Sequence, residues 1–218
     1  MVCMLLVLAT QNPQTGMEWI LRMEQTYAQL LSYRDSGVCK CGDEQTTFET
    51  AYKAPGKLFF QFTDGRLTDY VRSSGVTGLG DSDAAYQKPT LLAEFYRGEA
   101  TGQDTLVNGL ARFAGTSRFT SMIVPAMLIP GLGGRPFHEL SNPVVKGTER
   151  VDGHDCVVVD GDFAKLYIGK LDNALYKAVD RDLQEIITYH PVLNPKVADG
   201  LFAFKKSAFD PRLPATPR

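Results

Sequence analysis

The sequence has few of the residues from which metal sites and catalytic centres are built. It contains 218 residues with only 3 histidines and 4 cysteines. None of the histidines lies in an H-E-x-x-H pair, and there is no G-x-S-x-G elbow for a serine nucleophile. Cys39 and Cys41 have no histidine at the short spacings of zinc sites. We predict a protein that is not an enzyme and uses no metal or cofactor; a hydrolase built on Cys39 or Cys41 is the least favoured alternative.

Charge of one sign is lacking as well. The formal net charge is −2 and the pI is about 5.9, and no long block of basic or acidic residues occurs. A basic patch is the usual footprint of nucleic-acid binding, so the composition argues against a nucleic-acid partner. The apolar content of 44% and charged content of 22% are those of an ordinary folded protein.

Long hydrophobic runs are missing too, since no stretch reaches the roughly 20 apolar residues of a membrane-spanning helix. Cys3–Ala9 is an apolar run of signal-peptide length, although no Lys or Arg precedes it. We interpret residues 1–15 as a shortened signal peptide or leader; a short strand or the front of the first helix is the alternative. Residues 16–211 are expected to form one domain, and residues 212–218 a proline-rich tail.

Helical periodicity is present in one early stretch, Met17–Tyr33, where apolar residues recur at helical spacing. Thr15 or Gly16 can cap its start. We predict a helix that packs on a sheet.

Strand signals dominate the rest of the first half. Val38–Cys41 and Thr46–Lys53 flank a Gly42-Asp43 turn, and an aromatic hairpin is expected over Ala51–Val71. In that hairpin Leu58, Phe60 and Phe62 share one face and Phe59 lies on the other. Asp64-Gly65 is expected to turn the chain into a returning strand, Arg66–Val71, with a further strand over Val71–Leu79.

A helical insertion is predicted next, with segments at Thr90–Arg97, Thr105–Ala114 and Ser117–Ile129, the last interrupted by Pro125. Such an insertion can be a structural plug for a curved sheet or a movable lid over a pocket. The sequence does not choose between the two.

Strands then resume around an Asp152-Gly153 turn. They are expected at Val144–Val151, Asp155–Asp160, Ala164–Gly169, Ala174–Asp180, Gln184–His190 and Leu201–Lys205. About ten or eleven strands with short connections predict an α+β fold in which a strongly curved antiparallel sheet forms an open, incomplete β-barrel.

Several stretches together resemble one family. They are MEQTYAQLLSYRDSG, YKAPGKLFFQF, VDGHDCVVV, LYIGKLDNALYKAV and YHPVLNPKVADGLFAFK. They are similar to the LolA/LolB type of periplasmic lipoprotein-localisation factors over residues 17–211. The resemblance implies an open barrel whose helices cover an apolar, acyl-chain-binding cavity. It also implies a periplasmic or otherwise secreted, monomeric carrier with a transport or chaperone role in the bacterial cell envelope.

We therefore expect a carrier for lipoproteins or other acyl-chain ligands, possessing a hydrophobic cavity. Its expected partners are acyl chains and membrane-associated envelope proteins. Candidate lining residues, taken from the alternation alone, are Phe48, Tyr52, Leu58, Phe60, Phe62, Phe95, Met122 and Met127. The alternative is a structural, sensor or protein-interaction module with the same fold and a filled interior.

The cysteines leave one further question open. In an exported protein Cys156 could form a disulfide with Cys39 or Cys41, and the sequence does not choose between them.

Overall fold

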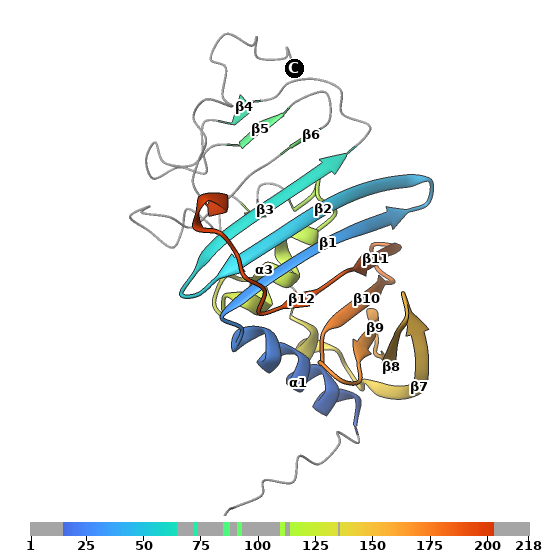
Figure 1. The fold of residues 1–218 in the computed structure, drawn as a ribbon. Helices are drawn as coiled ribbons and strands as arrows, with labels where there is room; N and C mark the ends of the chain where they lie inside the picture. The colour runs from blue at the N-terminus through green and yellow to red at the C-terminus, as the bar shows by residue number, and fades with distance from the viewer. Residues whose placement is uncertain are drawn as a thin grey trace, which may run out of the picture.

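The computed structural model describes residues 15–64, 72–73, 85–87, 91–92, 110–111, 114–134 and 136–202. Its main element is a nine-stranded antiparallel sheet in the order β3-β2-β1-β11-β10-β9-β8-β7, with β12 also paired to β1 (Figure 1). The strands are β1 Ser32–Cys41, β2 Glu44–Lys53, β3 Lys57–Asp64, β7 Val144–Val151, β8 His154–Asp160, β9 Ala164–Gly169, β10 Leu175–Asp180, β11 Glu185–Tyr189 and β12 Val192–Leu193. Because β3 and β7 are edges that do not pair with each other, the sheet curves without closing. This confirms the expected α+β open barrel.

Two tight turns were predicted correctly from their residues. Asp152 and Gly153 both have positive φ, at 46° and 88°, as a two-residue turn between β7 and β8 requires. Gly42, with φ of 57°, lies in the turn between β1 and β2. Local turn chemistry therefore sets the register of both hairpins.

A second sheet contains β4 (Arg72–Ser73), β5 (Ala85–Gln87) and β6 (Leu91–Leu92). The prediction of a helix over Thr90–Arg97 was wrong at Leu91–Leu92, since Leu92 pairs with Tyr86 of β5. Cross-strand pairing outweighs the helical preference of the leucines here. The other residues of 90–97, residues 65–71 of the aromatic hairpin and most of 105–114 lie outside the described residues, although Leu110 and Ala111 are helical.

The first helix, α1 (Gly16–Ala28), begins with the expected cap. The Glu18 backbone N–H donates to Thr15 Oγ1 at 3.2 Å, and the Thr15 N–H donates to the Glu18 carboxylate at 2.8 Å, forming a capping box. The helix ends before Tyr33, not at it as predicted, because Tyr33 is already in β1 and pairs with Tyr52. Sheet pairing thus ends the helix where periodicity alone would continue it.

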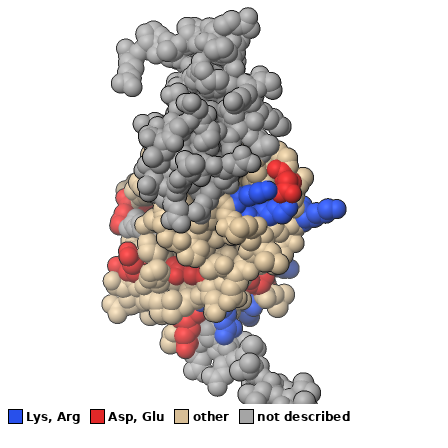
Figure 2. All heavy atoms as spheres, turned by 90° about the vertical axis from the view of Figure 1, so that its left-hand side faces the viewer, with Lys and Arg blue, Asp and Glu red and all other residues tan. Residues whose placement is uncertain are grey.

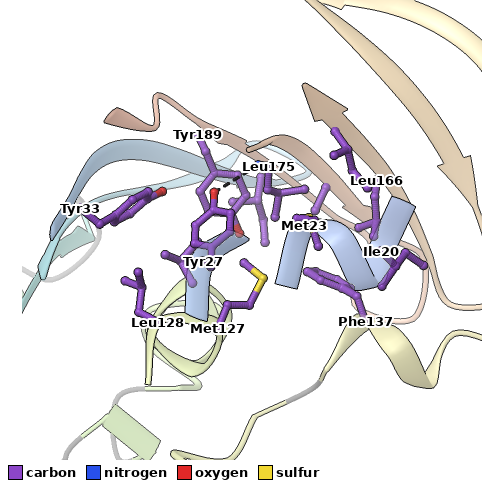
Figure 3. Packing of buried hydrophobic residues seen from close by; sticks show 14 of the residues in the cluster. Ile20, Met23, Tyr27, Tyr33, Met127, Leu128, Phe137, Leu166, Leu175 and Tyr189 are labelled. Carbon is purple, nitrogen blue, oxygen red and sulfur yellow. Dashed lines mark hydrogen bonds between the residues drawn. The ribbon is translucent and has the colours of Figure 1, made fainter. Parts of the chain in front are cut away.

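The inner face of the sheet is filled by helices. Ile20, Met23 and Tyr27 of α1 point toward strand residues such as Leu166 and Leu175 (Figure 3). On the other side of α1 lie Met127 and Leu128 of α3 (Val124–Leu128) and Phe137 of the short helix η2 (Phe137–Glu139). These elements and the sheet share one hydrophobic core, so the helices close much of the concave side.

The last predicted strand, Leu201–Lys205, was wrong at its start, where η3 (Asp199–Phe202) is a 3₁₀ helix. Val197 and Phe202 pack with Ala51 and Phe59 on the outer face of β2 and β3. Phe59, whose partner was unknown from the sequence, is therefore covered by the C-terminal segment. Burial of Phe59 under this segment favours the compact 3₁₀ helix over the extended strand that was predicted.

The described cysteines Cys39, Cys41 and Cys156 are all free thiols. Cys39 lies in the inner core, whereas Cys156 belongs to an outer cluster with Val158 and Tyr176. Since these side chains occupy opposite faces of the sheet, a Cys39–Cys156 disulfide is not formed.

A buried polar cluster lies on the inner face of β1. Tyr33 Oη donates to Asp35 Oδ2 at 3.0 Å, and the Thr50 N–H donates to Asp35 Oδ1 at 2.8 Å. The Tyr27 ring packs against the Tyr33 ring in a tilted arrangement with centroids 5.3 Å apart, and the Tyr27 hydroxyl accepts the Leu175 N–H at 3.1 Å. Burial raises the pKa of the Asp35 carboxyl to about 7.

Gly37 illustrates how tightly the sheet is packed at its centre. It pairs with Phe48, and a Cβ at Gly37 would lie 2.2 Å from the Phe48 ring and 2.6 Å from the Thr188 carbonyl oxygen. We expect Gly37→Ala to lower the free energy of unfolding by about 1–3 kcal/mol, since the ring or the backbone must move. Urea unfolding measures this cost; a change within about 0.5 kcal/mol, as at an ordinary surface site, would contradict it.

Candidate ligand-binding site

The candidate site is formed by residues 114–134, which we call the cover segment. This segment includes the 3₁₀ helix η1 (Thr120–Met122) and α3, where Pro125 occupies the first turn. Pro125 therefore starts a helix that it was expected to interrupt, because proline is tolerated in the first turn.

Buried hydroxyls hold the start of the cover segment in place. Ser121 Oγ donates to the Leu110 carbonyl at 2.9 Å and lies 3.1 Å from Ser117 Oγ. Thr120 Oγ1 donates to the Ser117 carbonyl at 2.6 Å. These bonds satisfy polar groups that are shielded from water, and they hold the turns of the segment to one another and to Leu110.

A cavity of about 690 Å³, which we call the inner cavity, lies between the cover segment and strands β10 and β11. Its described lining residues are Ala111, Ala114, Gly115, Phe119, Met122, Ile123, Gly134, Phe137, Asp180, Leu183, Glu185 and Ile187. The walls are mainly apolar, with carboxylates only on the sheet side. Cavities of this size and character are typical of small-molecule sites.

A second hollow of about 590 Å³, the α1 groove, runs between α1 and the cover segment. Its described lining residues are Leu21, Glu24, Gln25, Ala28, Ile123, Ala126, Met127, Pro130, Gly131, Gly133, Gly134, Pro136, Phe137, His138 and Glu139. Ile123, Gly134 and Phe137 line both spaces, so these residues form the wall between them.

Gly134 allows the wall to be thin. It has a φ of 147°, and a Cβ there would lie 2.6 Å from the Met122 carbonyl oxygen. Only glycine fits this approach without strain, so the loop lies directly against the cover segment.

The sheet side of the inner cavity ends in a buried ion pair. Glu185 Oε1 lies 3.6 Å from Arg118 Nη1, and Arg118 Nη2 also contacts the Glu44 carboxylate. The side chain of Glu185 is only 6% exposed. Burial raises the pKa of this carboxyl above its usual value, while the Arg118 charge opposes that rise.

Arg118 and Phe119, with φ of 53° and 57°, both adopt the left-handed conformation. This conformation is costly for residues other than glycine and marks strain that surrounding contacts must hold. It lies where the chain meets both the ion pair and the cavity wall.

Only some of the candidate lining residues predicted from the sequence border one of these two spaces in the structure. Met122 lines the inner cavity and Met127 the α1 groove. Leu58, Phe60 and Tyr52 are packed in the core and line neither space, while Phe48 and Phe62, also buried, border a separate hollow of about 250 Å³. Phe95 lies outside the described residues. The aromatic face of β2 and β3 is therefore mostly covered by protein side chains.

Sequence reasoning missed the sheet residues of the cavity. Glu185 and Ile187 were within a correctly placed strand, but neither was singled out. The available signal was the alternation in EIITY, which puts Glu185 on the same face as Ile187 and Tyr189. A carboxylate on an apolar strand face indicates a site or a buried partner.

Charges elsewhere on the molecule are mixed. Acidic and basic side chains are interspersed over the described part of the face in Figure 2, without a broad patch of one sign.

Two structural features are absent from the described part of the chain. Among those residues there is no group of three or more His, Cys, Asp or Glu placed to hold a metal ion. None of the described helices is long and apolar enough to cross a membrane.

No protein-family model matches this chain, and no curated protein matches it either. Solved structures do. A complex of Pseudomonas aeruginosa MucA and MucB matches at 12% identity over 87% of this chain and 61% of the matched chain, with a TM-score of 0.45. The lipoprotein LppX of Mycobacterium tuberculosis matches at 13% identity over 84% of this chain and 96% of its own, with a TM-score of 0.44.

An outer membrane lipoprotein-sorting protein domain from Vibrio parahaemolyticus matches at 8% identity over 86% of this chain and 95% of its own, with a TM-score of 0.30. The chain spans about 60% of the MucB chain. These likenesses concern the fold.

Proposed function

We propose that this protein is a binding protein or carrier for ligands with an acyl chain, which it holds in the inner cavity. The observation that carries this proposal is a mainly apolar space of about 690 Å³ between the sheet and the cover segment. It is the arrangement in which an amphiphile would be shielded from water on both sides.

The energetics favour such a ligand. Each methylene removed from water contributes about 0.8 kcal/mol, so a chain of roughly fifteen carbons offers on the order of 10 kcal/mol before ordering costs. A volume of this size falls within the range of about 300–1,000 Å³ seen for small-molecule sites.

Release requires that one wall of the cavity can move. The wall formed by Ile123, Gly134 and Phe137 is thin, and the adjacent Met122 adapts its shape more readily than branched side chains do. We propose that displacement of the cover segment opens the cavity, as lids do in other ligand-binding proteins.

We place the protein in the bacterial cell envelope as a periplasmic or secreted monomer, with the acyl chains of lipoproteins or other lipids as ligands. The apolar Cys3–Ala9 run and the sequence resemblance support this location.

A second candidate, a protein-interaction module, is favoured by a different observation. The concave side of the sheet is largely occupied, since Leu58, Phe60 and Phe62 are fully buried beneath other side chains. A protein that used its fold only for docking would need no accessible cavity.

Filling the inner cavity separates the two candidates. Gly115 lines the cavity, and a Cβ on Gly115 would meet no atom of a described residue within 4 Å. We expect Gly115→Trp to weaken binding of a neutral fluorescent apolar dye, N-phenyl-1-naphthylamine, by at least about tenfold while the protein stays folded. Titration of delipidated protein with the dye measures this.

Gly200→Trp is the matched control, because Gly200 also has open space at its Cβ but lies in η3, away from the cavity. It should bind the dye as the natural protein does. Saturable dye binding that Gly115→Trp leaves unchanged would place the ligand elsewhere, and no saturable binding by the natural protein would favour the interaction module.

A further inference from the structure

The polar end of the inner cavity is acidic. Among its described lining residues, Asp180 and Glu185 are the only ones that carry charge. Arg118 is not among the lining residues and already contacts both Glu185 and Glu44. A ligand in the cavity would therefore meet carboxylates and not the guanidinium.

The two carboxylates differ in what they offer to a ligand. Asp180 Oδ1 accepts the backbone N–H groups of Asp182 and Leu183, at 2.9 and 3.0 Å, and so serves the turn after β10. Glu185 Oε1 faces Arg118, but Oε2 is buried and accepts no N–H or O–H hydrogen bond from any described residue. Cys39, a neighbour of Glu185, offers only a weak thiol donor.

A buried carboxylate oxygen without a hydrogen bond is costly, and a bound donor group removes that cost. The position of this oxygen matters, because Glu185 lines a space whose described walls are apolar except for Asp180 and Glu185 itself. An amphiphile whose chain occupies the apolar part would bring its polar end to Glu185.

We propose that the inner cavity selects amphiphiles whose polar end donates a hydrogen bond, such as an ammonium, hydroxyl or amide group, and rejects free fatty acids. This inference rests on the proposed function and adds the class of head group. The donor would lie against Glu185 Oε2. A fatty-acid carboxylate would instead face Glu185 and Asp180 across a medium of low dielectric constant, where like charges repel strongly.

Competition against the bound dye tests the head group separately from the chain. Dodecylammonium, dodecanol and dodecanoate share one chain and differ only at the polar end. Below their aggregation concentrations at neutral pH, we expect dodecylammonium and dodecanol to displace N-phenyl-1-naphthylamine at concentrations at least about tenfold lower than dodecanoate.

The outcomes distinguish the two levels of the proposal. Failure of all three amphiphiles to displace the dye would overturn the carrier function and the head-group preference together. Displacement by all three at similar concentrations, or best by dodecanoate, would overturn the head-group preference and leave the carrier function standing.

A substitution at Glu185 then tests whether this residue causes the head-group preference. Glu185→Gln keeps the shape of the side chain but removes the charge and adds an amide donor, so the preference against dodecanoate should shrink to below about threefold. Glu149→Gln removes an exposed charge from β7 and should keep the full preference. If Glu185→Gln does not fold, the ranking in the natural protein still decides the proposal; a folded variant with unchanged ranking would overturn the role of Glu185.

Discussion

Raising the pH from about 4 to about 8 should lower the free energy of unfolding by about 4 kcal/mol through Asp35 alone. The Asp35 carboxyl is fully enclosed by Tyr33, Thr50 and the inner core, and its pKa in the folded protein is about 7 instead of 3.8. Desolvation is the main cause, and the hydrogen bonds from Thr50 and Tyr33 oppose it only in part.

The direction follows from proton binding. Because the folded-state pKa is raised, the folded protein binds more protons than the unfolded chain between about pH 4 and pH 7. The contribution of Asp35 to the free energy of unfolding is complete below the pKa of the unfolded chain. It falls as the pH rises through this window and stays low above it. Glu49 is the charged group that adds to the rise, while Tyr27, Tyr33 and Tyr189 have raised pKa values and stay neutral throughout.

Asp35→Asn isolates this effect. An asparagine can accept the Thr50 N–H through Oδ1 and donate to the Tyr33 hydroxyl through Nδ2, so it replaces the carboxyl without its charge. We expect the variant to lack most of the pH dependence and to exceed the natural protein in stability at about pH 8. Urea unfolding at several pH values measures both.

Asp155→Asn, on the exposed end of β8, controls for the loss of one negative charge and should retain the natural pH dependence. The comparison between variants matters because Glu185 also has a raised pKa and contributes with the same sign. Parallel pH curves for Asp35→Asn and the natural protein would contradict the assignment.

The second large effect concerns Phe60, which the sequence placed in the ligand site. Its side chain is fully buried and packs beside Phe48 and Phe62, with ring centroids 6.4 and 6.0 Å away, and it lines neither large space. We expect Phe60→Ala to lower the free energy of unfolding by about 3–5 kcal/mol, since it leaves a cavity in a packed core. Dye affinity of the folded protein should change less than about threefold.

Phe119→Ala provides the opposite case. Phe119 is 43% exposed and lines the inner cavity, so its truncation should cost affinity more than stability. Chemical unfolding and dye titration of both variants give the comparison. Loss of dye binding without loss of stability in Phe60→Ala would return Phe60 to the ligand site.

Phe60 was predicted to line the ligand site but is packed in the core, whereas Glu185 lines the cavity but was not predicted. This difference shows what the alternation of apolar and polar residues in a strand can and cannot predict. A period of two predicts which strand residues share a face, and it correctly grouped Leu58, Phe60 and Phe62. It does not say what covers that face. Here α3 packs against β2, and these residues are enclosed in the core that α3 shares with the sheet, whereas the cavity lies over β10 and β11.

Elements with local causes were predicted well. The capping residues of α1, the Asp152-Gly153 turn and the strands of the second meander follow from side chains within a few positions of each other. Elements decided by pairing or packing with another segment were not. Leu91–Leu92 pairs as a strand, Leu201 lies in a 3₁₀ helix, and Tyr33 ends helical structure early.

The sequence by itself determined an α+β protein with a curved, open antiparallel sheet, because turn residues and alternation act over a few positions. Only the tertiary structure decided which apolar face is sealed, where the inner cavity lies, and that Cys39 and Cys156 face apart. It also placed the carboxyl groups of Asp35 and Glu185 out of water. Those outcomes depend on packing between segments far apart in the chain, which local patterns do not encode.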